Sequence, residues 1–438
     1  MKRAILLFLP ALAFAAVKPG DKPLTGPTFN KDVAPIFYDR CVNCHREGNV
    51  APMSLLTYKD ARPWVKSIRE KVSNHAMPPW TADPHYGKFL NDRQLTLQQI
   101  NTIVAWVDSG AKEGVETPPP PAPKVPKGWN LGEPDQVFEM GEEYTVPAEG
   151  TIDYQHFVVP TNFKEDRWIR AAEIRNLSPQ VMHHVIVFIQ PPSTFRMQSM
   201  GIRPGPGWNP PKRDPEVEIH GSGGVRANRG SLGFFLTATA PGERGTTFSE
   251  GSGMRIPAGS NLIFQVHYIA KGTPVKDRAK IGLFYLKQPP EYEVRTIGVQ
   301  NGQFTLPAGE ANQRVESSMT FAEDAHITAL APHMHLRGKS FEYRLVTPDG
   351  KIQTILSVPN FDFNWQTIFT LAEPLAIPKG SRLECTAYFD NSKGNKLNPD
   401  ATKDVRWGDQ TWEEMMIGFT TYSVDSQKPI PVAAGGGQ

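Results

Sequence analysis

The stretch Thr117-Pro118-Pro119-Pro120-Pro121-Ala122-Pro123-Lys124-Val125-Pro126 divides the 438-residue chain into two parts with different sequence patterns. Proline lacks a backbone donor and favours extended polyproline geometry, so a semi-rigid spacer is expected over residues 116–130. Before the spacer, apolar residues recur at helical spacing. After it, short apolar runs typical of strands dominate. We therefore expect a multidomain protein, which a chain of this length also favours.

Three apolar stripes with helical spacing precede the spacer. The first two consist of Phe29, Val33, Ile36 and Phe37, and of Trp64, Ile68 and Val72. The third follows a Thr96/Gln99 pair that resembles a capping box, ends near Gly110, and consists of Ile100, Ile103, Val104 and Val107. These stripes predict a small all-α domain over residues 28–115.

The motif Cys41-Val42-Asn43-Cys44-His45 lies directly after the first stripe. In a CxxCH motif the two thiols attach to the vinyl groups of a heme, and the adjacent histidine ligates the iron. A redox dithiol and half of a zinc site are the alternative interpretations, although no second CxxC is present to complete a zinc site. The motif predicts a covalently attached heme c in a domain that resembles class I-type cytochromes c.

The second axial ligand of that iron is expected downstream of the motif. Met77, in His75-Ala76-Met77-Pro78-Pro79-Trp80, is the favoured candidate because prolines hold its loop and a thioether raises the iron potential. Met53 is an alternative that is more simply explained as a core residue. His75 would instead give a bis-histidine iron of lower potential.

Short runs rich in Val, Ile, Phe, Tyr and Thr follow the spacer without intervening helices. Examples are 185–189, 262–268, 327–331, 341–346 and 417–422. Such runs predict antiparallel sandwiches or jelly rolls. Because about 300 residues exceed one sandwich, we divide the region into two all-β domains at 131–291 and 292–428. The Gly- and Pro-rich stretch 191–253 is expected to be a long excursion of loops, and residues 429–438 a flexible tail.

The first residues have the features of an export signal. Met1-Lys2-Arg3 precedes an apolar run from Ala4 to Leu12 and the small-x-small sequence Ala13-Phe14-Ala15, which predicts a signal peptide over residues 1–15. This favours a periplasmic or otherwise secreted protein without a membrane span, because the apolar run is too short for one. The formal charge of +2 is nearly balanced and no block of Lys and Arg stands out, so nucleic acid is not expected as a partner. Cys385, the one cysteine outside the motif, is expected to be buried and inert.

Five histidines lie in three short apolar settings: Met182-His183-His184-Val185, Val266-His267-Tyr268 and Pro332-His333-Met334-His335. His333 and His335 would share one face of a strand and could bind the same ion. His183 and His184 could do so only at a strand end or bulge. Imidazoles suit zinc, copper, iron or nickel, and an added thioether such as Met415 favours copper. The isolated His156, His220 and His326 are expected to be structural.

These motifs, in this order, resemble the copper type II, ascorbate-dependent monooxygenases, which include the peptidylglycine α-hydroxylating and dopamine β-monooxygenases. The resemblance covers residues from about 135 to 425 and rests on His-His, Gln-Val-His-Tyr, His-x-His followed by Leu-x-Gly-Lys, and Glu-Met before a final strand. It implies two jelly-roll domains that face each other across a solvent-filled cleft. It also implies one copper at His183, His184 and His267 for electron transfer and one at His333, His335 and Met415 for catalysis, with Met416 as an alternative ligand.

The resemblance implies O2-dependent hydroxylation of a C–H bond in a small organic substrate, with the heme domain relaying electrons from an external donor. Ala331, Ile417 and Phe419 stand where the peptide-amidating enzymes bind a peptide carboxylate, so a glycine-extended peptide is a poor substrate candidate. The alternative function is storage, delivery or sensing of copper without turnover, because His and Met ligands also suit transport. A third possibility is that the metal sites only stabilise the sandwiches.

Overall fold

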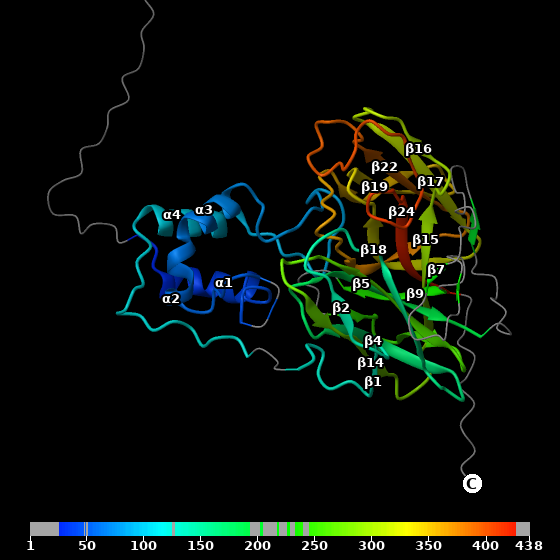
Figure 1. Ribbon diagram of the computed structural model, residues 1–438, viewed down its shortest axis with the longest axis horizontal. Helices are drawn as coiled ribbons and strands as arrows, with labels where there is room; N and C mark the ends of the chain where they lie inside the picture. The colour runs from blue at the N-terminus through cyan, green and yellow to red at the C-terminus, as the bar shows by residue number, and fades with distance from the viewer. Residues whose placement is uncertain are drawn as a thin grey trace, which may run out of the picture.

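The computed structural model describes residues 26–47, 49, 51–124, 128–192, 202–204, 217–218, 226–227, 233–239 and 245–425. The expected signal peptide, the expected tail and His220 lie outside the described residues, as does much of the stretch 191–253. Where that stretch is described, the expectation of loops alone was wrong, because residues 234–239 form a strand that pairs with residues 185–189. Within the described part, one helical unit lies beside a larger β-rich region (Figure 1). No described helix is both long enough and apolar enough to cross a membrane.

The helical unit consists of short helices at the expected places. They are the π-helical turn η1 (Phe29–Val33), α1 (Ala34–Arg40), α2 (Tyr58–Ala61), the 3-10 turn η2 (Arg62–Trp64), α3 (Val65–Ser73) and α4 (Leu97–Asp108). The Thr96/Gln99 capping box at the start of α4 is confirmed, since both of its reciprocal hydrogen bonds are present. Gly110 follows the end of α4 with a φ of 96°, a conformation that glycine adopts without strain.

The core of the helical unit corrects one sequence prediction and adds one residue. Trp64 was expected on the buried face of its helix but is 41% exposed, because it ends the 3-10 turn before α3. Val65 occupies the buried face in its place. Trp106, which the stripe analysis did not include, is fully buried and packs its ring against Phe29 and Phe37. Its indole N–H donates to the carbonyl of Lys112 at 2.9 Å, so the polar atom of this core residue is satisfied.

The β-rich region is built around a nine-stranded sheet with the order β1-β14-β4-β11-β15-β24-β18-β21, in which β10 also pairs with β4. Its strands are β1 (Gln136–Glu139), β4 (Arg167–Asn176), β10 (Thr246–Thr247), β11 (Ser252–Ile256), β14 (Ala279–Tyr285), β15 (Tyr292–Gln300), β18 (Ala325–His333), β21 (Phe369–Ile377) and β24 (Ile417–Val424). This sheet runs through both halves of the region.

Two smaller sheets cover the two halves. The four-stranded sheet has the order β3-β12-β5-β9 and consists of β3 (Gln155–Pro160), β12 (Asn261–Tyr268), β5 (Met182–Gln190) and β9 (Phe234–Thr239). The five-stranded sheet has the order β20-β19-β22-β17-β6 and consists of β20 (Ile352–Val358), β19 (Gly338–Val346), β22 (Arg382–Phe389), β17 (Gln313–Phe321) and β6 (Ile202–Pro204). The expected strands are thus confirmed.

Three two-stranded pairs complete the region: β2 (Tyr144–Val146) with β13 (Val275–Asp277), β16 (Thr305–Leu306) with β23 (Val405–Arg406), and β7 (Val217–Glu218) with β8 (Arg226–Ala227). The apolar side chains form two separate cores. One core draws on residues 138–294 and the other on residue 82 and residues 299–424. We call these halves the N-terminal and the C-terminal sandwich.

The two sandwiches are joined through the parallel pairing of β11 and β15, in which Ser252 lies opposite Tyr292. Because β11 belongs to one sandwich and β15 begins the other, the nine-stranded sheet is continuous across the junction. The segment that begins at Tyr292 therefore leaves one core and enters the other.

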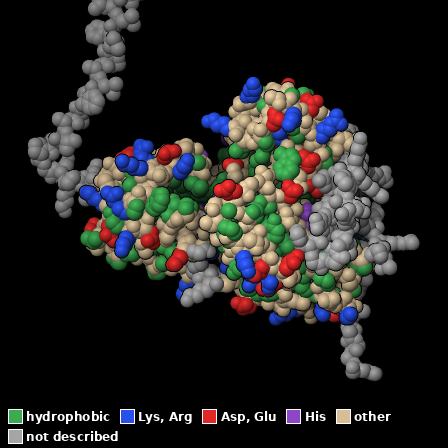
Figure 2. Space-filling view, viewed as in Figure 1, with side chains coloured by type: hydrophobic (Ala, Val, Ile, Leu, Met, Phe, Trp, Pro, Cys, Tyr) green, Lys and Arg blue, Asp and Glu red, His purple; other side chains and the backbone are tan. Residues whose placement is uncertain are grey.

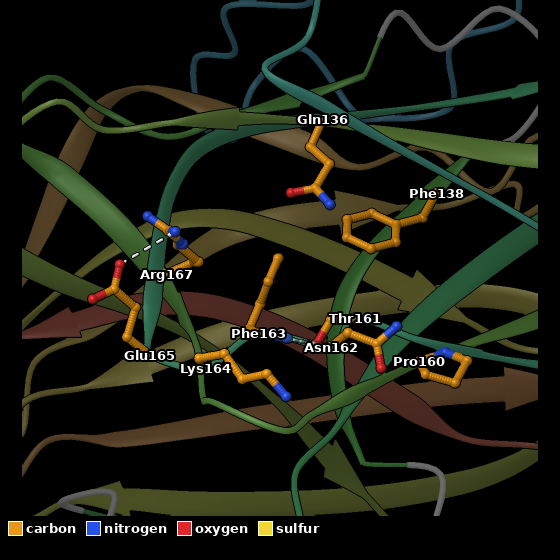
Figure 3. Close-up of a pocket in the computed structure, with 9 residues that line it drawn as sticks. All are labelled: Gln136, Phe138, Pro160, Thr161, Asn162, Phe163, Lys164, Glu165 and Arg167. Carbon is orange, nitrogen blue, oxygen red and sulfur yellow. Dashed lines mark hydrogen bonds and ion pairs between the residues drawn. The ribbon is translucent and has the colours of Figure 1, made fainter. Parts of the chain in front are cut away.

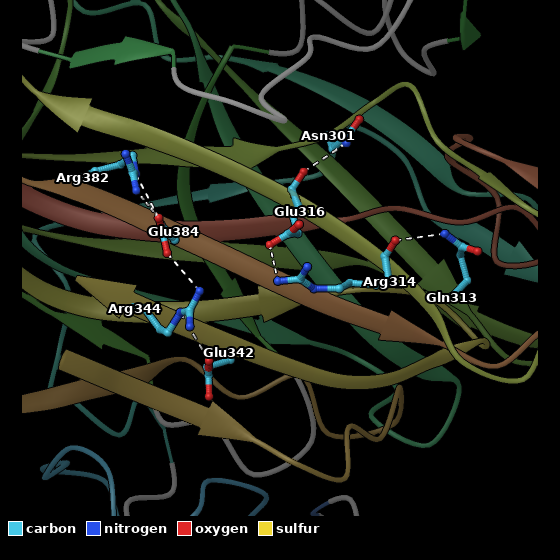
Figure 4. Close-up of polar contacts among 8 residues, drawn as sticks. All are labelled: Asn301, Gln313, Arg314, Glu316, Glu342, Arg344, Arg382 and Glu384. Carbon is cyan, nitrogen blue, oxygen red and sulfur yellow. Dashed lines mark hydrogen bonds and ion pairs between the residues drawn. The ribbon is translucent and has the colours of Figure 1, made fainter. Parts of the chain in front are cut away.

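The outward face of the five-stranded sheet is charged. Arg344 and Arg382 on neighbouring strands both bind the Glu384 carboxylate, at 3.1 and 2.5 Å, and Arg314 pairs with Glu316 at 2.6 Å (Figure 4). Cross-strand pairs of opposite charge stabilise a solvated sheet face modestly. Charged and apolar side chains therefore alternate along these strands, because the charged ones point to this solvated face and the apolar ones point into the core.

Candidate metal centres

Three of the predicted ligands, His183, His184 and His267, come together between β5 and β12. His267 lies opposite His184 in the ladder, but the next residue, Tyr268, lies opposite Met182, so His183 is the extra residue of a β-bulge. A bulge reorients consecutive side chains that would otherwise point to opposite faces of the sheet. The bend that joint ligation requires is therefore present. We call these residues the three-histidine group.

The ring nitrogens of the three-histidine group are spaced as metal ligands are. The Nδ1 atom of His183 lies 3.0 Å from that of His184 and 3.3 Å from that of His267. Two imidazole nitrogens that bind one tetrahedral ion at about 2.0–2.1 Å are about 3.3 Å apart. One nitrogen from each ring lies within 4.8 Å of the others, so the group could hold a metal ion.

Burial keeps these imidazoles neutral. It lowers the pKa of His183, lowers that of His267 to about 3, and lowers that of His184 well below its ordinary value, with the neighbouring histidines acting in the same direction. A neutral imidazole keeps the lone pair that a metal ion needs. The Nε2 atom of His184, the ring nitrogen outside these close contacts, is buried and has no hydrogen-bond partner among the described residues.

His333 and His335 form a second group, which we call the two-histidine group. His333 is the last residue of β18 and His335 lies in the turn beyond it, yet their rings meet at 5.2 Å between centroids and at 90°. Their Nδ1 atoms are already bonded, to the Gln366 side chain at 2.5 Å and to the Glu413 carbonyl at 3.2 Å. Such bonds fix the tautomer and leave Nε2 available for a metal.

The two-histidine group is as deeply buried as the first. His335 is fully buried, and its Nε2 atom has no partner among the described residues. Burial lowers the pKa of His333 to about 4 and that of His335 well below its ordinary value. Both rings are therefore neutral donors at pH 7, as ligation requires.

Glu414 ties the two-histidine group to the predicted methionine ligand. Its buried carboxylate accepts from the backbone N–H of His335 at 2.8 Å and of Arg337 at 2.6 Å, and Met415 follows it in the chain. Met416 is fully buried within the core of the C-terminal sandwich, whereas Met415 is half-buried and outside that core. Of the two methionines, Met415 is the one whose thioether is not committed to packing.

Two aromatic side chains lie between the histidine groups, and sequence reasoning missed both. The ring of Tyr154, from the N-terminal sandwich, lies 4.9 Å from that of His267 and 6.3 Å from that of His335. Phe363, from the C-terminal sandwich, stacks on His183 at 4.8 Å and lies 6.0 Å from His335. The groups thus share one buried region filled by aromatic rings, where the family resemblance implies a solvent-filled cleft. Histidine is barely visible on the face shown in Figure 2.

The loop between β20 and β21 contacts both groups. The Asn364 side-chain oxygen lies 3.3 Å from the Nε2 atom of His183, and Gln366 binds His333. No motif marked Phe363, Asn364 or Gln366, because contacts between domains leave no periodicity in the sequence. We call residues 361–368 the bridging loop.

A small cavity of about 30 Å³ adjoins both groups. It is lined by His184, Ile186, Phe235, Ala238, Thr239, Ala331, Pro332, His333, Gln366, Ile368 and Phe419. A cavity of this size holds about one small molecule such as water. Apart from the histidines, its walls are mostly apolar. They include Ala331 and Phe419, two of the positions that depart from the peptide-binding pattern.

The CxxCH motif follows α1 directly. The Nδ1 atom of His45 lies 3.3 Å from the carbonyl oxygen of Met53, a contact that directs the Nε2 atom away from the backbone. Cys41 and Cys44 are half-buried and form no disulfide. Burial raises the pKa of Cys41 to about 12, whereas redox-active dithiols have lowered thiol pKa values. A raised thiol pKa does not favour the redox-dithiol interpretation.

The candidates for the second axial ligand differ in their surroundings. His75 is exposed and has a positive φ of 58°, and Met77 is half-buried. Met53 contributes its backbone carbonyl to His45. These surroundings favour Met77 over His75 without placing either side chain opposite His45.

Other histidines have ordinary partners. His156 contacts Gln265 at 3.0 Å, and His326 contacts Asp425 at 2.7 Å near the surface. The remaining cysteine, Cys385, is fully buried in β22, and burial raises the pKa of its thiol. The expected burial of Cys385 is thus confirmed.

A wider groove of about 630 Å³ lies away from the histidine groups, along the connection from β3 to β4 (Figure 3). Its lining residues are Gln136, Phe138, Pro160, Thr161, Asn162, Phe163, Lys164, Glu165 and Arg167. The Glu165 and Arg167 side chains pair with each other at 3.2 Å. None of the predicted ligands lines this groove.

No protein-family model and no curated protein matches this chain. Among solved structures, PNGF-II aligns with 66% of this chain and 65% of its own at 10% identity and a TM-score of 0.28. The infectious bursal disease virus Gt strain aligns with 68% of this chain and 76% of its own at 10% identity and a TM-score of 0.19. Allantoicase covers 57% of this chain and 79% of its own at 7% identity and a TM-score of 0.16. Likenesses this remote say nothing about function.

Proposed function

We propose that this protein is an exported heme and dicopper monooxygenase that hydroxylates a C–H bond of a small apolar substrate. The observation that supports it most is the meeting of two buried groups of neutral histidines, one from each sandwich, with Tyr154 and Phe363 packed between them. The overall reaction takes the substrate, O2, two electrons and two protons to the alcohol and water.

The two groups suit different tasks. The three-histidine group supplies a complete nitrogen set from one sandwich, which favours a stationary copper that passes electrons. The two-histidine group supplies two nitrogens and, with Met415, one soft sulfur, which leaves copper a position for a reactant. Copper bound there would supply the activation of O2. Gln366 and Glu413 hold the His333 and His335 rings, and burial excludes bulk water.

The cavity points to the substrate class. Its walls of Ala331, Ile368 and Phe419 carry no charge that would bind a carboxylate or an amine. Because the cavity holds about one water molecule, a substrate of alkylbenzene size would have to displace side chains from its walls. We therefore expect small apolar molecules, such as alkylbenzenes, to be oxidised in preference to peptides or catecholamines.

The helical unit would hold heme c through Cys41, Cys44 and His45, with Met77 as the second axial ligand. Its role would be to receive electrons from an external donor and pass them on one at a time. Electron supply of this kind suits a chain whose predicted signal peptide places it outside the cytoplasm.

The test is oxygen incorporation by the full-length protein loaded with heme and copper. We expect ethylbenzene, ¹⁸O2 and a chemically reduced heme to give a labelled alcohol in step with heme reoxidation. A copper storage or delivery protein would bind two coppers but show no substrate-dependent uptake of O2. A purely structural site would keep its metal whether or not reductant is present.

A further inference from the structure

The segment 80–91, which connects α3 to α4 in the helical unit, lies on the C-terminal sandwich. The N–H of Leu90 donates to the carbonyl of Thr370 at 2.8 Å, and the N–H of Ala372 donates to that of Lys88 at 2.8 Å. Phe89 pairs with Leu371 as an antiparallel bridge. The segment therefore extends the nine-stranded sheet at β21, its edge strand. We call residues 80–91 the docking segment.

Side chains strengthen this attachment. The Asn91 amide donates to the Ile368 carbonyl at 2.7 Å and accepts from the Thr370 N–H at 3.1 Å. The rings of Trp80 and Phe89 lie 5.0 and 5.4 Å from the ring of Phe369. In addition, Ala82 is buried in the core of the C-terminal sandwich. Parting this contact would expose apolar rings, which favours keeping the two units together.

The docking segment lies between the candidate iron ligand and the loop that contacts both histidine groups. At one end, Trp80 is three residues after Met77, the candidate iron ligand. At the other end, Asn91 binds the carbonyl of Ile368, the last residue of the bridging loop, and Phe89 packs against Phe369, which follows it. Within that loop, Gln366 binds His333 at 2.5 Å. Phe363 and Asn364 contact His183 in the same loop.

We propose that the docking segment is the route by which electrons pass from the helical unit to the copper groups, through Trp80, Phe369 and the bridging loop. The inference rests on the proposed function. In each step a ferrous heme is oxidised to the ferric state and one cupric ion is reduced to the cuprous state. No bond forms or breaks, and an external reductant restores the heme.

The physical reason is the continuity of the packing. Electron tunnelling slows steeply with distance and is favoured through bonded or closely packed atoms. From Trp80 the path runs through a ring contact with Phe369 and a short stretch of chain to the bridging loop. There Asn364 contacts His183 of the three-histidine group, and Gln366 binds His333. The proline spacer is the competing route for electrons. Most side chains of residues 115–124 are exposed, and this segment runs as a single extended stretch of chain (Figure 1).

The experiment measures electron transfer rather than turnover. In the anaerobic full-length protein, the heme is reduced by a flash of light with a flavin photoreductant, and its reoxidation by cupric copper is followed by visible absorbance. We expect Trp80→Leu to slow reoxidation about tenfold, equivalent to about 1.4 kcal/mol in the barrier. We expect Trp80→Phe to restore part of the rate, because an aromatic ring is present again.

Phe304→Leu is the matched control. Phe304 also packs against the core of the C-terminal sandwich, where it stacks on Phe389 at 5.5 Å, but it is not part of the docking segment. Its variant should lose stability without a change in the reoxidation rate. Asn91→Ala removes both side-chain bonds to β21 and should also slow reoxidation.

Heme absorbance and copper content, measured in every sample, separate this inference from the proposed function. A loaded protein whose rate is unchanged in both Trp80→Leu and Asn91→Ala overturns the docking route alone. A wild-type protein that binds no heme or no copper overturns both proposals. Slower reoxidation in Trp80→Leu and Asn91→Ala, with the Phe304→Leu rate unchanged, supports the route.

Discussion

The three-histidine group and the two-histidine group differ in how the chain completes them. In the first, all three nitrogens come from neighbouring strands of one sheet, and a bulge at His183 brings them together. In the second, the two rings come from a strand end and a turn, and Gln366, Glu413 and Glu414 hold them from other segments. A donor set that comes from one sheet suits a metal ion whose ligands stay the same during the reaction. A donor set held by several segments suits a metal ion that also binds a reactant.

The largest effect that would sharpen this comparison is expected from Met415→Ala. Removing the one soft ligand of the two-histidine group should lower substrate oxidation by at least about a hundredfold, since loss of mere outer partners costs 10–100-fold. Oxygen uptake and product formation measure this, and heme content should be unchanged.

Met416→Leu is the control for that variant. Met416 is fully buried in the core, where leucine has nearly the same volume, so activity should remain close to wild type. If Met416→Leu abolished oxidation and Met415→Ala did not, the assignment of the two methionines would have to be reversed.

The next effect is on affinity. In Glu414→Gln an NH2 group, which cannot accept, replaces one of the two side-chain oxygens that accept from backbone N–H groups, so the change should loosen the turn that carries His335. We expect copper affinity at the two-histidine group to fall about 10–100-fold while that of the three-histidine group is unchanged. Copper titration followed by electron paramagnetic resonance distinguishes the two sites. Equal weakening of both would show that Glu414 supports the whole region rather than one group.

A third prediction concerns the metal-free protein at acid pH. Burial lowers the pKa of His267 to about 3 and that of His333 to about 4, against about 6.5 in an unfolded chain. Between these values the unfolded state binds more protons, so stability falls as the pH decreases below about 6.5. Each such histidine contributes up to about 1.4 kcal/mol per pH unit, as measured by urea unfolding.

Protonation of Glu414 changes the stability in the opposite direction to protonation of the histidines. Burial raises its pKa to about 8, so the folded state binds its proton first and gains stability as the pH falls from about 8 to 4.5. It offsets one histidine only, and the five histidines together should dominate. His267→Gln should reduce the slope of stability against pH below 6.5. An unchanged slope would mean that His267 is not held neutral by burial.

The elements were more predictable than the contacts between them. Apolar spacing indicated the three helical stripes and the main strands, because local pattern determines which face of an element is buried. Trp64 was misplaced because a 3-10 turn shifts the buried face by one residue. The sequence showed that joint ligation by His183 and His184 requires a strand end or a bulge. It could not show that the bulge is present, because the register of a strand depends on its partner strand.

The candidate site was partly predictable for a related reason. Histidines in apolar runs stand out by residue type, so the ligand candidates could be named before any geometry was known. Tyr154, Phe363 and Gln366 are ordinary residues in ordinary settings, and only the packing of one sandwich against the other gives them a place beside the histidines.

The smallest expected effect, from Tyr154→Phe, tests what separates the two groups. The Tyr154 ring contacts both groups, but its hydroxyl is buried and has no hydrogen-bond partner among the described residues. Removing an unpaired buried hydroxyl relieves its desolvation cost, so stability should be unchanged or rise by up to about 1 kcal/mol, as measured by thermal unfolding. Tyr154→Ala should instead cost about 3–5 kcal/mol, because it removes the ring that fills the space between the groups. If Tyr154→Phe were the damaging change, the hydroxyl rather than the ring would be what this position contributes, and the groups would communicate through a polar contact instead of packing.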